Sequence, residues 1–145
     1  MFKLKNNHLA ISIKIKAPLE EVWNSLAQWE KQSEWMLQTK VWVTSETTTG
    51  VGTKISAFTG VSRFGVLDTM EVTHWEPPYT CDVVHTGKII KGTGRFQLRE
   101  LSPNHTAFDW SEDVWAPPII FAFVKPAIFL GVRISLARFA QTFHQ

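Results

Sequence analysis

Three polar residues, Asp68, His85 and Glu112, are the groups in this sequence that could do chemistry. Each lies in a run that reads as a β-strand, and alternate side chains of a strand face the same side of the sheet. Each is an even number of residues away from the apolar residues of its run and therefore faces the same side, so all three are predicted to point inward. In a dry pocket, where burial raises the pKa of a carboxyl group toward neutrality, Glu112 or His85 could move protons.

The apolar residues in step with these groups define the wall of the predicted pocket. Those in step with Glu112, within residues 105–115, are Phe108, Trp110 and Val114. Those in step with His85, within residues 79–86, are Tyr79, Cys81 and Val83. Those in step with Asp68, within residues 64–75, are Phe64, Val66, Met70 and Val72. Polar groups that converge in an apolar pocket are typical of a ligand site.

Each of the three groups also has a purely structural interpretation. Glu112 could reach water near a strand end or pair with Arg95, and His85 could lie at the rim of the turn at Thr86-Gly87. A β-bulge before Asp68 would reverse the side of the sheet that it faces. At the level of the sequence these alternatives stay open.

Other kinds of chemistry have little support in the sequence. Cys81 could be a nucleophile beside a histidine, but a small buried side chain on a strand is the commoner role of a lone cysteine. The five histidines show no i, i+4 pairing and no neighbouring cysteine pair, so no zinc spacing occurs. A Gly-rich phosphate loop and a Gly-x-Ser-x-Gly elbow are both missing from the sequence. We predict no metal and no cofactor.

Composition indicates one globular domain over residues 1–145. Hydrophobic residues make up 44% of the chain and charged residues 19%, which is not the composition of a disordered protein. The net charge is +2 with the basic residues scattered, and this argues against nucleic acid as a partner. One cysteine excludes an internal disulfide, and the N-terminus lacks the apolar core of a secretory signal. We therefore predict a cytoplasmic protein.

Residues 117–145 predict one long, mostly apolar helix in which only Lys125, Arg133 and Arg138 carry formal charge. A membrane span needs about 20 apolar residues, and Lys125-Pro126 interrupts this one early. A helix buried against a curved sheet is favoured instead. Because proline removes a backbone donor and clashes with the preceding turn, a kink or break is expected at Pro126.

This helix has two apolar faces. The stripe predicted to enter the core consists of Ile128, Val132, Leu136, Phe139 and Phe143. A second face consists of Ile119, Phe123, Leu130 and Ile134. Exposed apolar patches of this kind usually mark an interface, so a dimer contact or a membrane contact is expected unless the N-terminal region covers them.

The rest of the chain predicts one strand, two short helices and then six strands. Residues 8–16 alternate strictly, and Pro18 suits the first position of a helix whose first turn holds Glu20 and Glu21. A second short helix is expected at about 30–36. Short links rich in turn-forming residues separate the later strands, so neighbouring strands should be antiparallel. Such a sheet tends to curl, and the terminal helix can cover its concave face.

The segment ISIKIKAPLEEVWNSLAQWEKQSEWM resembles the opening of the START-like superfamily, also known as SRPBCC, of polyketide cyclases/dehydrases and lipid-transport proteins. The later VGTKI, EVTHWEPPY and TAFDW segments and the Pro-interrupted final helix resemble that family as well. Gln28 stands where many relatives carry aspartate. The resemblance implies an α+β, Bet v 1-like helix-grip fold, with a curved antiparallel sheet of six to seven strands wrapped on the C-terminal helix. It also implies a deep apolar cavity with Trp35 near its mouth.

These arguments define the predicted ligand-binding residues, which are Trp35, Asp68, Met70, Cys81, Val83, His85, Phe108, Trp110, Glu112 and Phe121. Binding of a hydrophobic small molecule or lipid, for transport or sequestration, is the favoured function. The first alternative is an enzyme of the polyketide cyclase or dehydratase type, with Glu112 or His85 as acid or base. The second is a membrane-surface or interaction module that uses the C-terminal helix. The sequence does not name the ligand or decide whether a reaction is catalysed.

Overall fold

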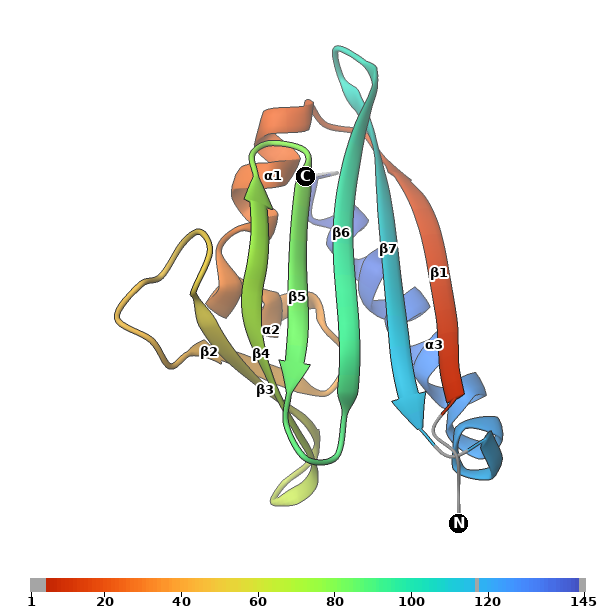
Figure 1. The fold of residues 1–145 in the computed structure, drawn as a ribbon. Coiled ribbons are helices and arrows are strands. Elements are labelled where there is room, and N and C mark those ends of the chain that lie inside the picture. Colours follow the sequence, from red (N-terminus) through yellow and green to blue (C-terminus); the bar gives the residue numbers. More distant parts are fainter. Residues whose placement is uncertain (1–4, 117, 144–145) are drawn as a thin grey trace.

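The computed structural model describes residues 5–116 and 118–143, and it shows a seven-stranded sheet with helices on one face (Figure 1). In chain order the elements are β1 (Lys5–Ile15), α1 (Leu19–Leu26), the 3-10 helix η1 (Trp29–Lys31), α2 (Gln32–Trp35), β2 (Thr39–Val43), β3 (Lys54–Val61), β4 (Phe64–Glu76), β5 (Thr80–Thr86), β6 (Lys91–Ser102), β7 (His105–Ala116) and α3 (Pro118–Gln141).

The sheet order is β1-β7-β6-β5-β4-β3-β2, and every neighbouring pair is antiparallel. Strands β2 to β7 form a meander, in which each strand pairs with the next one along the chain. Strand β1 pairs with the other edge of β7 and so forms one edge of the sheet. Helix α3, 24 residues long, crosses the same face of the sheet as α1 and α2 (Figure 1). The predicted helix-grip architecture, with two short helices after the first strand, is confirmed.

Helix α1 forms where the sequence signals coincide. Pro18 precedes the first turn in an extended conformation, and Glu20 and Glu21 lie in that turn, where the helix dipole favours negative charge. Val22, Trp23 and Leu26 form its buried stripe.

Phe139 of α3 is the centre of the aromatic core. Its ring centroid lies 4.6 Å from that of Trp35, 5.8 Å from that of Phe108 and 5.2 Å from that of Phe143. Ser135, one turn earlier, accepts a hydrogen bond from the backbone N–H of Leu37 at 2.8 Å. These contacts fix the C-terminal half of α3 to the sheet and to the α2–β2 connection.

The N-terminal half of α3 is packed less tightly than the stripe predicts. Leu136 and Phe139 are buried as expected, but Ile128 is exposed. Ile128 lies on nearly the same side of the helix as Phe139, but roughly 16 Å further along the axis at 1.5 Å per residue. The stripe therefore indicated the correct side of α3 and was wrong about how far the core extends beneath it.

The second predicted face of α3 is also open. Ile119, Leu130 and Ile134 are exposed, whereas the side chains of Phe121 and Phe123 lie outside the described ones. The helix continues through Pro126, so the predicted break does not occur, and a kink stays a prediction. No helix among residues 5–116 and 118–143 is long and apolar enough to span a bilayer.

Three residues predicted to point inward from strands are exposed instead. Tyr79 precedes β5, which begins at Thr80, so it belongs to the turn. Phe64 and Val66 lie in β4, but the pairing of β4 with β5 includes only residues from Met70 onward. The β3–β4 hairpin therefore extends past β5, and its tip residues Phe64 and Val66 are exposed.

We predict that Phe139→Ala lowers the free energy of unfolding by about 3 to 5 kcal/mol, because it removes the ring at the centre of the core. The matched control is Phe129→Ala on the same helix, where the ring is partly exposed and the loss should stay below about 1 kcal/mol. Urea unfolding measures both. Equal losses would show that α3 is not anchored through Phe139.

Candidate functional site

His85 lies between two carboxylates on the helix-covered face of the sheet. Its Nδ1 is 2.8 Å from Oδ1 of Asp68, and its Nε2 is 2.7 Å from Oε2 of Glu112. The side chains of His85, Asp68 and Glu112 are 3%, 18% and 15% exposed. We call these three residues the carboxylate–histidine cluster.

Three strands supply the cluster, and a fourth leaves room for it. Asp68 comes from β4, His85 from β5 and Glu112 from β7, so the contact between His85 and Glu112 passes over β6. The residues of β6 paired with His85 and Glu112 are Gly92 and Gly94. A Cβ on Gly94 would lie 2.9 Å from Oε1 of Glu112, which is too close without a shift of that carboxylate.

Gly92 is required for a different reason. Its φ is +133°, a backbone conformation that side chains disfavour, and a Cβ there would collide with the carbonyl oxygen of Asp113. The sequence analysis missed both glycines. Glycine inside a strand often marks a close approach, so Gly-Thr-Gly within a predicted strand was a usable signal.

Three of the four structural alternatives for these groups do not occur, and the fourth, contact of Glu112 with water, is limited to a side chain that is 15% exposed. Arg95 binds Asp82 through two hydrogen bonds of 2.7 and 2.9 Å, so it does not pair with Glu112. His85 is buried rather than at a solvent-exposed rim. The irregularity in β4 falls between Val72 and His74, after Asp68, and therefore does not reverse the side that Asp68 faces. Beyond it Trp75 turns inward, with its ring 5.0 Å from that of Trp23.

The electrostatics favour a protonated cluster. Burial alone would lower the pKa of His85, but the hydrogen bonds and negative charges of Asp68 and Glu112 outweigh it and raise the pKa to about 10. Burial raises the pKa of Glu112, and the contact with His85 opposes this. The pKa values of His85 and Glu112 are thus both raised, so the cluster holds its protons more tightly than the isolated groups would.

Part of the predicted apolar wall is buried on the same strands as the cluster. Cys81, Val83, Phe108 and Trp110 are buried, and Met70 packs against them. Burial raises the pKa of the Cys81 thiol to about 12, so this thiol stays neutral and is a poor nucleophile. Within the described residues, no group of three His, Cys, Asp or Glu side chains is arranged to hold a metal ion.

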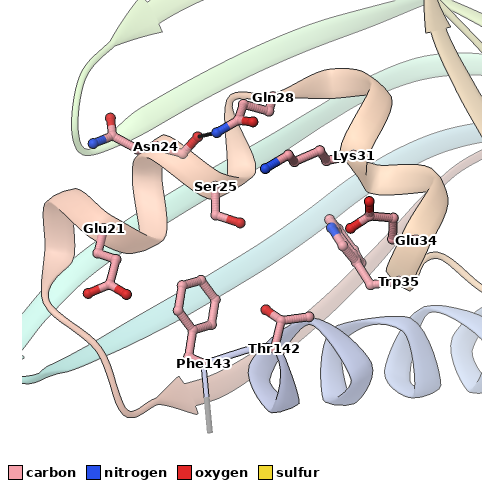
Figure 2. A pocket seen from close by; sticks show the side chains of 9 residues that line it. All are labelled: Glu21, Asn24, Ser25, Gln28, Lys31, Glu34, Trp35, Thr142 and Phe143. Atoms are coloured by element: carbon pink, nitrogen blue, oxygen red, sulfur yellow. Dashed lines mark hydrogen bonds between the residues drawn. The ribbon is translucent and has the colours of Figure 1, made fainter. Parts of the chain in front are cut away.

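Of two hollows that described residues line, neither includes the cluster. The larger, of about 590 Å³, lies between α1, the short helices and the end of α3 (Figure 2). Its lining residues are Glu21, Asn24, Ser25, Gln28, Lys31, Glu34, Trp35, Thr142 and Phe143. The smaller, of about 190 Å³, includes Met70. Of the predicted ligand residues, Trp35 lines the larger of these two hollows and Met70 the smaller, and the ligand role of the full set stays a prediction.

Comparison with known proteins identifies the fold. No protein-family model matches the chain, and no curated protein sequence matches it. Solved structures do match. The Zhui aromatase/cyclase from Streptomyces sp. R1128 is 15% identical, with a TM-score of 0.81 over 97% of this chain and 94% of that one. A START superfamily protein from Mycobacterium smegmatis is 12% identical, with a TM-score of 0.80 over 97% and 99%.

A third similar structure is norcoclaurine synthase from Thalictrum flavum, in complex with dopamine and hydroxybenzaldehyde. It is 11% identical, with a TM-score of 0.72 over 97% of this chain and 87% of that one. Such low identities show a shared fold and leave the ligand undefined. The chain has the START-like, or SRPBCC, helix-grip fold that its sequence resembles.

We predict that His85 carries both ring protons at neutral pH and releases one only near pH 10. Since the ordinary pKa is 6.5, the folded chain binds more protons than the unfolded chain between these values. The stability that comes from the protonation of His85 is therefore fully present below about pH 6.5 and is lost as the pH rises toward 10. Nitrogen NMR of the imidazole, with urea unfolding at each pH, measures both effects.

Asp68→Asn should lower the pH at which His85 deprotonates, because it removes one of the two carboxylates. The matched control is Asp82→Asn, whose carboxylate contacts Arg95 and not His85. A neutral His85 at pH 7 in the unaltered protein would contradict this account of the cluster.

Proposed function

We propose that the chain binds a hydrophobic small molecule or lipid between the sheet and α3, with its polar end at the carboxylate–histidine cluster. The observation that carries this proposal is the cluster itself, a largely buried, hydrogen-bonded ionic group on the helix-covered face of the sheet. Charged groups buried in this way are costly unless partners offset the cost, and apolar residues of similar volume would often be as stable. A role in binding explains why polar groups stand there.

The remaining hydrogen-bonding capacity of the cluster indicates what the ligand should offer. Both ring nitrogens of His85 are engaged, and the free lone pairs belong to the carboxylates of Asp68 and Glu112. The ligand's polar end should therefore donate a hydrogen bond, as a hydroxyl, phenol or amine does. Norcoclaurine synthase, which shares the fold, was solved with dopamine and hydroxybenzaldehyde, and this supports the proposal by analogy only.

A second candidate is an enzyme of the polyketide cyclase or dehydratase type. The specific observation in its favour is the direct contact between His85 and Glu112, a defined acid–base pair. Because His85 has no free ring nitrogen, Glu112 would be the group that exchanges a proton, and its raised pKa suits that role. Asp68 and His85 would then position its carboxyl group. The similar Zhui structure is an aromatase/cyclase, and this makes the candidate worth testing.

Substitution of Glu112 by glutamine separates the two functions. Native mass spectrometry of the purified protein first identifies a co-purified molecule, whose affinity is then measured. For a binding protein, Glu112→Gln should leave affinity within about tenfold, near 1.4 kcal/mol, since the amide can still hydrogen-bond. For an enzyme, the same change should abolish turnover while binding is largely kept.

The matched control is Asp113→Asn in the same strand. Asp113 is the next residue of β7 and contacts His8 at 2.9 Å, so it faces away from the cluster. The Asp113→Asn substitution should change neither the ligand affinity nor the turnover. Loss of more than about a hundredfold in affinity with Asp113→Asn, and none with Glu112→Gln, would contradict a ligand site at the cluster.

A further inference from the structure

One end of the sheet exposes large apolar side chains on its turns. At the tip of the β3–β4 hairpin Phe64 is 78% and Val61 is 68% exposed, and in the β5–β6 turn Ile89 is 73% exposed. Trp115 near the end of β7 and Ile119 in the first turn of α3 are exposed as well. Exposed apolar side chains that gather on one part of a surface, unlike singly scattered ones, usually mark an interaction site.

The topology places the β3–β4 and β5–β6 turns, the end of β7 and the start of α3 at the same end of the molecule (Figure 1). Strand β3 ends and β4 begins there, with Val61 paired to Phe64. Strand β5 ends and β6 begins there, with Thr86 paired to Lys91, and Gly92 pairs with Val114 near the end of β7. We call this end the turn face, defined by residues 60–67, 86–91, 114–115 and 119.

The charged residues at the tips of the turn face are all basic. Residues 60–67 and 86–93 contain Arg63, Lys88 and Lys91 and neither aspartate nor glutamate. All three cations are exposed. The opposite end of the sheet differs, since its turns and the start of α1 carry Lys16, Glu20, Glu21, Glu76 and Glu100. The protein is therefore basic and apolar at one end and acidic at the other.

We propose that the turn face docks on a lipid bilayer that contains anionic lipids. Separate apolar tips with cations between them suit a headgroup layer, where the tips enter the acyl boundary and the cations contact phosphate or carboxylate groups. The exposed face of α3, with Leu130 and Ile134, extends the same apolar character along the helix.

Docking in this orientation would bring the candidate site to the membrane. His85 is followed directly by Thr86, the last residue of β5, so the carboxylate–histidine cluster lies toward the same end of the sheet as the turn face. A ligand could pass between bilayer and protein without crossing water. This consequence rests on the proposed ligand binding, whereas docking itself does not.

Co-sedimentation of the full chain with vesicles tests the proposal. We expect binding to vesicles of phosphatidylcholine mixed with phosphatidylserine, weaker binding to phosphatidylcholine alone, and a decrease with added salt. The double variant Phe64→Ser and Ile89→Ser should lose at least about tenfold in partition coefficient, because it removes two inserted side chains. Lys88→Glu with Lys91→Glu should abolish the preference for phosphatidylserine.

The matched control is the double variant Tyr79→Ser and Leu101→Ser, which removes exposed apolar side chains at the opposite end of the sheet. It should bind vesicles as the unaltered protein does. The proposal is overturned if neither vesicle binds the protein, or if both double variants weaken binding equally. It is also overturned if light scattering shows a dimer that Phe64→Ser with Ile89→Ser dissociates, since a second copy would then cover the turn face.

Failure of docking is distinguishable from failure of ligand binding. Glu112→Gln should leave vesicle binding unchanged, because its carboxyl group is buried below the turns. Circular dichroism of every variant establishes that it is folded before its partition coefficient is compared.

Discussion

The hydrogen bonds of His85 to Asp68 and Glu112 are the interaction on which the site depends. They join β4, β5 and β7 across a strand that has no side chain at the two paired positions, Gly92 and Gly94. Removal of either carboxylate leaves the other facing a buried imidazole whose charge is less well compensated. Gly94, the cluster and the order of the strands therefore form one arrangement, since a side chain at position 94 would displace the carboxylate of Glu112.

The packing of α3 divides the molecule into a fixed half and an open half. Phe139 and Leu136 are in the core, and Ser135 bonds to the backbone of Leu37, so the C-terminal half is held from two sides. Toward the start of the helix Ile128, Phe129 and Leu130 are exposed. Because β5 ends one residue after His85, the carboxylate–histidine cluster lies toward the end of the sheet at which β7 ends and α3 begins.

Alternation and turn spacing predicted most of the fold, because each depends on local geometry. They placed Asp68, His85 and Glu112 on the covered face, and the residues around them are buried as expected. They failed for Phe64, Val66, Tyr79 and Ile128 because a pattern indicates which side a residue faces but not how far the neighbouring element extends. The contact between His85 and Glu112 joins residues 27 apart across a third strand, and no single run of sequence encodes it.

The most direct test of the central claim is a crystal structure of the protein with the molecule that co-purifies with it. The account predicts density between the sheet and α3, with a hydrogen-bond donor of the ligand within about 3.2 Å of a carboxylate oxygen of Asp68 or Glu112. Density confined to the hollow between α1 and the end of α3, with the cluster surrounded only by protein, would contradict it (Figure 2).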